Sequence, residues 1–169
     1  AVAAYMRRNR EPHAPWNPPM PETLFTVDGQ QERLAATAQA EAEGTQIGWW
    51  LGLRDDPSQV IGHARFSQIA RGPFCSAMLG YSIDAAHEGR GLMREAISAA
   101  LADVFGPRVA LHRVQANARV ENTRSLTLLA RLGFAREGVA KEYLYIDGAW
   151  RDHVLTALRA PDWPVDRAP

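Results

Sequence analysis

The spacing of hydrophobic residues changes about halfway along the chain, and this change divides the predicted elements into two groups. In the first half, alternating or continuous apolar residues predict strands over Gln46–Leu53, Val60–Ile69 and Ala77–Asp84. Turn signals at Asp55-Asp56-Pro57 and Arg71-Gly72-Pro73 separate these strands. Because the connections are too short for crossovers, we expect an antiparallel meander.

Helical spacing begins at Leu92, where apolar residues recur at one-turn intervals as far as Phe105, and Gly106-Pro107 ends the helix. Further along, Asp147-Gly148 is a strong two-residue signal for a hairpin turn. The remaining predicted elements are a strand at Val109–Val120, a helix at Thr123–Leu132, an extended segment at Phe134–Val139 and the hairpin strands Lys141–Ile146 and Ala149–Leu158.

Before the strands, the sequence predicts a short helix ending near Asn9 and a helix over Gly29–Glu43. Between them we expect no helix from Pro12 to Pro21, because proline lacks an N–H donor and constrains the preceding residue. Trp16 in this connector is interpreted as a core anchor, with a position lining a groove as the alternative. The order of elements predicts a mixed α/β (α+β) fold with both crossover helices in the second half.

Composition narrows the class of protein. The 169 residues are 46% hydrophobic, which predicts a single domain, 1–169, with one core. With 19 basic and 19 acidic side chains, the chain lacks the bulk charge of a dedicated nucleic-acid or membrane-surface binder.

Cys75 is the one cysteine, which excludes an intrachain disulfide. The five histidines lack ligand spacing, so we expect no metal, and without a signal peptide or membrane span we expect a cytoplasmic protein.

The segment most suggestive of chemistry is the loop that joins the third strand to the first crossover helix. Gly89 and Gly91 remove side chains where a ligand must come close, and the first N–H groups of a helix lack internal partners. Together with the helix dipole they form a site for an anion such as a pyrophosphate, to which Arg90 or Arg94 could add charge. On this loop alone, a loop that binds nothing remains an equal alternative.

Two motifs in order resemble the GCN5-related N-acetyltransferase (GNAT) family. The loop Glu88-Gly89-Arg90-Gly91-Leu92-Met93 is similar to the acetyl-CoA pyrophosphate motif [QR]-x-x-G-x-[GA], from which Glu88 and Met93 depart. A second signature follows as Asn122-x-x-Ser125 and Leu128–Phe134. Within the family, the chain resembles the ribosomal-protein-alanine N-acetyltransferases of the RimJ and RimL type, and most of all RimJ, from about Asn9 to Trp163.

This resemblance implies a mostly antiparallel central sheet, flanked by about four helices, in which two central strands splay apart. The family's first strand is missing from this chain. The expected parts are a helix and connector (1–22), an acetyl-CoA-binding core (77–136) and a C-terminal hairpin (137–160). The pantetheine arm of the co-substrate acetyl-CoA would pair with the backbone of Tyr81, Ser82 and Ile83, where an N–H could also stabilise the oxyanion.

The resemblance also implies which residues carry the catalysis. The tyrosine that many members use as general acid is replaced by Leu129, and the matching serine of RimL-type relatives is Ser125. Asn122 is either a helix cap or a partner of pantetheine, with the ligand role favoured. Glu142, near the open end of the late hairpin, is the first candidate for general base, although a solvated hairpin charge explains it equally well. Asp84 is a weaker alternative, since a residue at that position could simply cap the phosphate loop.

We therefore expect direct attack of an amine on acetyl-CoA, the amine being the N-terminal alanine of a ribosomal protein. The same chemistry on a small amine or peptide antibiotic, and a non-catalytic CoA-binding or ribosome-assembly module, remain alternatives. The oligomeric state is left open. The net charge of zero hides a local excess, because residues 87–136 carry eight arginines against four acids, a net +4. Arg90, Arg94 and Arg131 are candidates to face the phosphates.

Overall fold

A six-stranded sheet in the order β1-β2-β3-β4-β6-β5 forms the centre of the molecule in the computed structural model, which describes residues 1–161. The strands are β1 (Ile47–Gly52), β2 (Val60–Ala70), β3 (Ser76–Ile83), β4 (Arg113–Arg119), β5 (Ala135–Ile146) and β6 (Ala149–Arg159). Pairing of β1 with β2 and of β2 with β3 is antiparallel, which confirms the predicted meander. Asp162 and Trp163 of the predicted resemblance lie outside the described residues.

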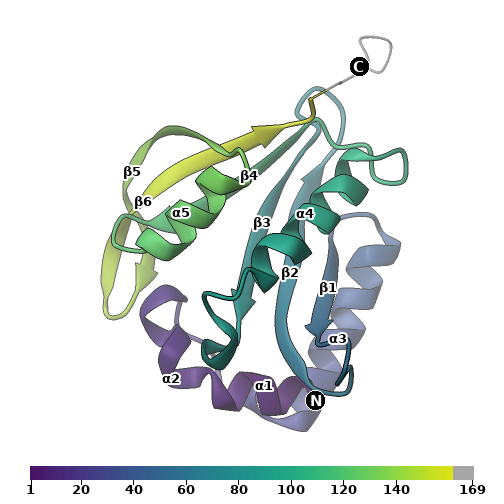
Figure 1. Ribbon diagram of the computed structural model, residues 1–169, viewed down its shortest axis with the longest axis vertical. Helices are drawn as coiled ribbons and strands as arrows, with labels where there is room; N and C mark the ends of the chain where they lie inside the picture. The colour runs from purple at the N-terminus through teal and green to yellow at the C-terminus, as the bar shows by residue number, and fades with distance from the viewer. Residues whose placement is uncertain (162–169) are drawn as a thin grey trace.

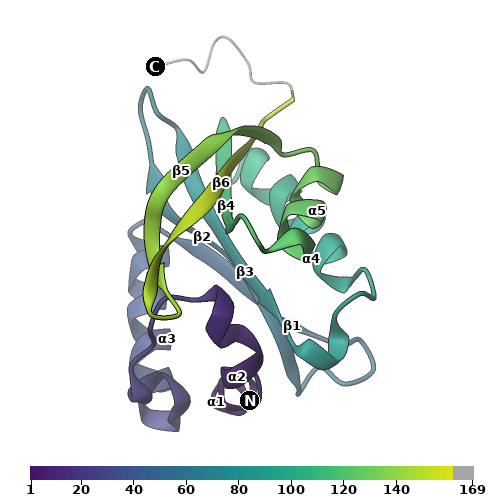
Figure 2. The same cartoon turned by 90° about the vertical axis from the view of Figure 1, so that its left-hand side faces the viewer.

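Helices cover both faces of the sheet (Figures 1 and 2). On one face lie α4 and α5, and on the other lies α3, while α1 and α2 cross below the lower end of the strands in Figure 1. The helices are α1 (Val2–Arg8), α2 (Arg10–His13), α3 (Val27–Ala42), α4 (Leu92–Phe105) and α5 (Thr123–Arg131), with 3-10 turns η1 (Ala14–Trp16), η2 (Glu22–Phe25) and η3 (Ala85–His87). The mixed α/β prediction is confirmed.

The hydrophobic core lies between the sheet and the helices α4 and α5. The helical spacing of α4 directs Ile97 and Val104 inward, where both are fully buried against Phe66 of β2 and Val114 of β4. Leu129 of α5 is 1% exposed in the same cluster. Each such side chain contributes roughly 1.5–3 kcal/mol through burial. This packing fixes α4 over one arm of the sheet and α5 over the other.

The two central strands separate along their length, as the resemblance implied. Strands β3 and β4 run parallel but pair only from Ser76–Met78 to Arg113–Gln115. Beyond Met78 they diverge, so that Figure 1 shows them together at the top and apart at the bottom. The splay leaves one edge of β3 and one edge of β4 without a strand partner over the rest of their length. We call the wider end of this splay its open end.

Three predicted elements differ from the structure. The extended segment predicted at Phe134–Val139 and the hairpin strand predicted at Lys141–Ile146 belong to one strand, β5. The connector was expected to contain no helix from Pro12 onward, but α2 runs through Pro12 and η1 follows. Proline is tolerated here because Pro12 lies in the first turn of α2, where its N–H would have no helical acceptor. The strand predicted from Val109 begins at Arg113, since Ala110 has a φ of 52° and its N–H bonds to the carbonyl of Gly106.

Candidate active site

The loop after β3 presents a row of backbone donors at the open end of the splay. No backbone N–H from Gly89 to Arg94 has a hydrogen-bond acceptor within residues 1–161, and the first helical bond of α4 is donated by Glu95 to the carbonyl of Gly91. Gly89 and Gly91 have φ of 72° and 80°, and a Cβ at either position would meet no protein atom within 4 Å. The space in front of these donors is therefore open, and its polarity suits an anion.

The residues around these donors have different roles in the structure. Met93 is 6% exposed and packs into the core, so its backbone alone faces the loop, and Leu92 is half-buried. Arg90 and Arg94 are exposed beside the loop. Arg131, also considered near the phosphates, lies at the C-terminal end of α5, roughly 12 Å along the helix from its first turn. The structure therefore excludes Arg131 from the loop and retains Arg90 and Arg94.

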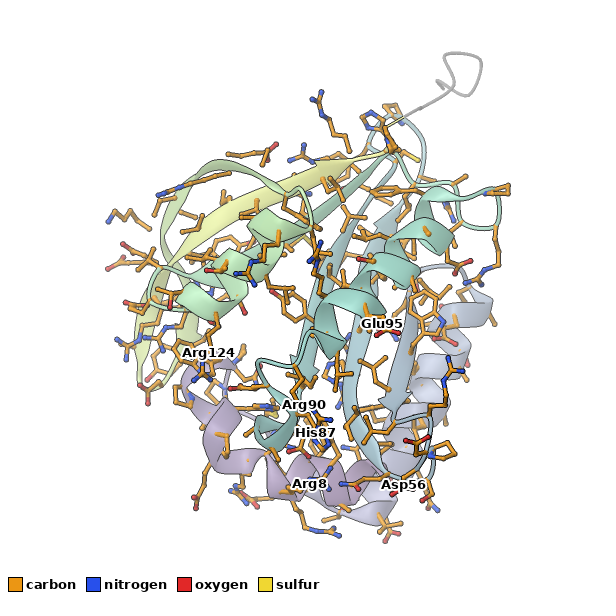
Figure 3. All side chains as sticks on the ribbon, viewed as in Figure 1. Arg8, Asp56, His87, Arg90, Glu95 and Arg124 are labelled. Carbon is orange, nitrogen blue, oxygen red and sulfur yellow. The ribbon has the colours of Figure 1, made fainter. Side chains whose placement is uncertain are left out.

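An ion pair across the open end was not expected from the sequence. Glu88 on the loop pairs with Arg124 in the first turn of α5. Figure 3 shows Arg124 and Arg90 on opposite sides of the open end. Because the pair joins the loop to α5, Glu88 is engaged by the protein itself rather than directed freely toward a ligand.

The start of α5 lies at the same end of the splay as the start of α4 because β3 and β4 run parallel. Asn122 caps α5, with its Oδ1 accepting the N–H of Ser125 at 3.1 Å. Its Nδ2 has no hydrogen-bond acceptor in the described part of the chain, so the cap and a ligand contact are compatible on one side chain. Ser125 is half-buried in the first turn.

The edge of β3 that faces the splay carries the backbone groups of Tyr81 and Ile83. The N–H of Asp84 points toward β2, where it bonds to the carbonyl of Ile61 at 2.7 Å. Since successive residues of a strand alternate in direction, Ile83 and Tyr81 point away from β2 and into the splay. His13 of α2 reaches this edge, and its Nε2–H donates to the carbonyl of Ile83 at 2.8 Å. The N–H groups of this edge remain available.

Ser82 has its side chain on the opposite face of the sheet. Its hydroxyl bonds to the hydroxyl of Tyr5 at 2.6 Å and to Nδ1 of His63 at 3.0 Å. Burial raises the pKa of Tyr5 to about 12, while burial and the charges of two nearby arginines lower the pKa of His63 to about 3. His63 is therefore neutral. Because the backbone groups of Ser82 point toward β2, as those of Asp84 do, the structure does not support the predicted contact of Ser82 with the cofactor.

Asp84 has the role of a cap rather than that of a base. Its side chain is 3% exposed, pairs with Arg8, and accepts the N–H of Ala86 at 3.0 Å. Burial favours the protonated form, but the bonds from Arg8, Ala86 and Asn9 outweigh it, so the pKa of Asp84 lies below its ordinary value. A carboxylate held in this way is a weak proton acceptor.

The N-terminal segment joins both arms of the splay on the face opposite α4 and α5. While His13 bonds to the end of β3, the carbonyl of Pro15 accepts a bond from Arg119 at the end of β4. The guanidinium of Arg119 lies 5.4 Å from the ring centre of Trp16, which is 41% exposed. Trp16 is therefore not the core anchor that was expected, because η1 holds it at the surface beside β4.

Side chains of three strands continue this face toward the hairpin. Asn117 of β4 donates to the hydroxyl of Tyr143 at 3.1 Å, and the ring of Tyr143 lies 5.3 Å from that of His153. His153 is 3% exposed. Tyr145 and Trp150 form an edge-on pair further along, both exposed. Asn117, Tyr143 and His153 come together only through strand pairing, so no local motif marks their contact. Tyr145 and Trp150, in contrast, flank the local Asp147-Gly148 turn.

Glu142 is exposed on β5, closer to the Asp147-Gly148 turn than to the open end of the hairpin, where it was expected. It lies in an irregular part of the β5–β6 pairing between Ala140 and Leu144 and has a φ of 48°. Its N–H donates to the carboxylate of Asp152 at 3.0 Å. A bulge of this kind redirects a side chain away from regular strand alternation.

Neither a metal cluster nor a membrane-spanning helix is found within residues 1–161. No group of three or more His, Cys, Asp or Glu side chains there is placed to hold a metal ion. No helix there has the length and apolar character needed to cross a membrane.

Comparison with known proteins extends over almost the whole chain. Residues 1–135 match the family model described as an acetyltransferase (GNAT) domain. The chain is 44% identical over 167 residues to ribosomal protein uS5-alanine N-acetyltransferase of Escherichia coli (strain K12), covering 98% of this chain and 84% of the relative.

Two solved structures are similar in fold and in sequence. Ribosomal-protein-S5-alanine acetyltransferase from Vibrio fischeri superposes with a TM-score of 0.90 at 36% identity, covering 96% of this chain and 88% of that chain. RimJ of Mycobacterium smegmatis, in complex with CoA-disulfide, gives a TM-score of 0.87 at 29% identity, covering 98% of this chain and 80% of that chain. The similarity therefore includes both arms of the splay and the N-terminal segment that joins them.

Proposed function

Because this chain belongs to the GNAT family of acetyltransferases, we propose that it transfers the acetyl group of acetyl-CoA to the N-terminal alanine of a ribosomal protein. The loop motif and Asn122-x-x-Ser125 predicted this family, and the family is confirmed. The observation that carries the proposal is the row of unpaired backbone N–H groups beside the unpaired edge of β3. The similarity of the chain to an alanine N-acetyltransferase supports the choice of acceptor. The proposed acceptor belongs to the ribosome, so the enzyme acts in the cytoplasm.

In this proposal, the α4–α5 face of the splay holds acetyl-CoA. The free N–H groups of residues 89–94 bind the pyrophosphate, and Arg90 and Arg94 supply positive charge beside it. The backbone of Tyr81 and Ile83 pairs with the pantetheine arm along the open edge of β3. The Nδ2 of Asn122 is a further donor on the opposite arm. In this proposal, the excess of arginines within residues 87–136 provides positive charge for an anionic ligand.

The reaction requires that the amine is neutral, that the oxyanion is stabilised and that the departing thiolate receives a proton. An N-terminal amine has a pKa of about 7.7–8.0, far below the roughly 10.4 of lysine, so its deprotonation near neutral pH is a modest task for a carboxylate. We assign that task to Glu142, whose bulge directs it away from regular strand alternation. An N–H of the β3 edge stabilises the oxyanion, and Ser125 donates its proton to the departing thiolate.

The N-terminal segment and hairpin form the acceptor side of this proposal. Trp16 and Tyr143 present exposed aromatic rings on the face opposite α4 and α5, where we place the acceptor peptide, and the buried His153 packs behind Tyr143. His13 keeps the end of β3 in place beneath it. A peptide acceptor is favoured over a small amine because the chain is 44% identical to an enzyme that acetylates the alanine of a ribosomal protein.

A set of peptides that differ only in their first residue tests the proposal. The full chain is incubated with acetyl-CoA and each peptide, and thiol release is followed. Peptides beginning with Ala are expected to react fastest, those with Ser more slowly, and those with Leu or Lys least. Reaction with a polyamine but with no peptide identifies a small-amine enzyme. If no acceptor gives thiol release while the protein still binds acetyl-CoA, the protein is a non-catalytic CoA-binding module and the proposal is contradicted.

A further inference from the structure

The hydroxyl of Tyr81 is buried and has no hydrogen-bond partner within residues 1–161. Nearly all buried polar side-chain atoms in folded proteins are partnered, so an unpartnered phenol requires an explanation. Burial raises the pKa of this hydroxyl to about 12. Tyr81 is therefore protonated at any pH at which the enzyme works, and its hydroxyl is available as a hydrogen-bond donor.

The position of Tyr81 relates this hydroxyl to the proposed reaction centre. Its side chain lies on the α4–α5 face of β3, because Ser82, the next residue, points to the opposite face toward Tyr5. Its ring packs against the core cluster that includes Met93 and Leu129. Tyr81 thus fills the base of the splay between the helices that form the cofactor side.

Ser125 is the polar side chain that acts on this hydroxyl. Ser125 lies in the first turn of α5, on the face of the sheet that also carries the Tyr81 side chain, and its hydroxyl opposes the rise in the pKa of Tyr81 that burial causes. They do not meet at hydrogen-bond geometry in the structure, and the Tyr81 oxygen stays unpartnered. A bond between them is chemically compatible with a second role for Ser125, since a serine hydroxyl can accept one bond while donating another.

The other tyrosines cannot supply a phenol at this place. The chain has four: Tyr5 bonds to Ser82 on the opposite face, Tyr143 bonds to Asn117, and Tyr145 is 45% exposed on the hairpin. At the position on α5 where a tyrosine acid is implied for many relatives, Leu129 is 1% exposed in the core. The described part of the chain therefore offers one phenol beside Ser125, and β3 carries it.

We propose that Tyr81 is a positioning residue for Ser125, an inference that rests on the proposed acetyl transfer. The Tyr81 hydroxyl donates to Oγ of Ser125, which directs the Ser125 hydrogen toward the sulfur of the thioester. When the C–S bond breaks, its electron pair stays on sulfur and takes the Ser125 proton. Water gives the Ser125 oxygen a proton as it loses its own, so no free alkoxide forms. Tyr81 keeps its proton throughout.

A double-mutant cycle tests this role. Tyr81→Phe removes one oxygen and keeps the packed ring, so the fold is retained, as thermal unfolding can verify. It is expected to lower kcat roughly tenfold, the effect of one hydrogen bond, with the KM for acetyl-CoA unchanged. In the Ser125→Ala background the same substitution is expected to change kcat less than about twofold, because the group that it positions is gone.

Tyr5→Phe is the matched control, since it also removes a buried hydroxyl but on the opposite face of β3. Tyr5→Phe is expected to change kcat by the same factor in the unsubstituted enzyme and in the Ser125→Ala variant. The proposal is overturned if Tyr81→Phe leaves kcat unchanged, or if it lowers kcat by the same factor in both backgrounds, which is the signature of an independent structural effect.

A second measurement needs no acceptor and therefore separates this inference from the proposed function. Bound CoA is titrated, and its thiolate is followed by ultraviolet absorbance. Hydrogen bonds to sulfur stabilise the thiolate, so Tyr81→Phe and Ser125→Ala are each expected to raise the thiol pKa, whereas Tyr5→Phe is not. A shifted thiol pKa without turnover on any peptide refutes the proposed acceptor alone. An unchanged thiol pKa in Tyr81→Phe refutes the role of Tyr81.

Discussion

The two sides of the splay are constructed in different ways. The cofactor side comes from two short stretches, residues 81–94 and 122–125, and presents mainly backbone N–H groups. The acceptor side joins side chains from distant parts of the chain, such as His13, Asn117 and Tyr143. A site made of backbone groups depends on local conformation, whereas one made of side chains depends on strand pairing. The first leaves a motif in the sequence and the second does not.

The largest effect is expected at Ser125, where the cofactor side depends on a side chain. Ser125→Ala is expected to lower kcat about 100-fold, the lower end of what general acid catalysis supplies, while the Kd of acetyl-CoA stays within about twofold. Ser98→Ala, on the exposed face of α4, is the control and should match the unsubstituted enzyme. Steady-state kinetics and calorimetric titration measure the two quantities. Unchanged turnover removes Ser125 from the mechanism.

A smaller effect is expected where the cofactor side depends on backbone conformation. Gly91 has a φ of 80°, which costs a residue with a side chain about 1–2 kcal/mol. Gly91→Ala should therefore misalign the donors of the loop and weaken acetyl-CoA binding roughly tenfold, with little change in the KM of the peptide. Gly138→Ala, at an ordinary φ with open space around it, is the control. Equal affinities for the two variants would contradict the role of the loop.

Asp84 connects the loop to the N-terminal segment, and its contribution is to stability. Its pKa is held below the ordinary value, so the contribution is fully present above about pH 4 and is lost as the pH falls through the folded-state pKa. Because Arg8 is 36% exposed, we expect Asp84→Asn to cost only about 1–2 kcal/mol at pH 7.

Urea unfolding at several pH values measures this difference. The difference in unfolding free energy between Asp84→Asn and the unsubstituted protein should shrink as the pH falls through the lowered folded-state pKa of Asp84. Asp103→Asn, which breaks the more exposed pair with Arg108, is the control and should cost less than about 0.5 kcal/mol. Turnover of Asp84→Asn should be retained, because the carboxylate acts as a cap. A loss of turnover comparable to that of a general base would reinstate Asp84 in that role.

The smallest effect is expected on the acceptor side, at His13. His13→Ala removes the donor to the Ile83 carbonyl and loosens the segment that joins the two arms. We expect the KM of the peptide to rise roughly threefold, with the KM of acetyl-CoA unchanged, since one neutral hydrogen bond is lost. His13→Gln keeps a donor and should recover part of the loss. A change in acetyl-CoA affinity alone would show that the two sides are not separate.

The sequence predicted those helices and strands whose hydrophobic residues recur with a clear period and whose ends are marked by turn or capping residues. The meander, α4 and the hairpin follow from apolar spacing and from turn signals such as Asp147-Gly148. The start of β4 was missed because Ala110 adopts a positive φ that the apolar run from Val109 does not reveal. The helix through Pro12 was missed because a proline in a first helical turn breaks no bond.

The candidate site could be predicted only where it is local. The glycines of the loop and the cap at Asn122 are visible as motifs. The Glu88–Arg124 pair, the contact of His13 with Ile83 and the exposure of Trp16 arise between residues far apart in the sequence. Such contacts are decided by how elements pack, and charge counting placed Arg131 near the phosphates although it lies at the wrong end of α5.

The central claim is that the open end of the splay joins a backbone-built cofactor side to an acceptor side suited to a peptide N-terminus. Its most direct test is the mass spectrum of a peptide that begins with Ala and contains one internal Lys, after incubation with acetyl-CoA and the enzyme. The account predicts a single acetyl group on the α-amine, because that amine loses its proton far more readily than lysine. Acetylation of the lysine side chain, or of neither amine, would contradict it.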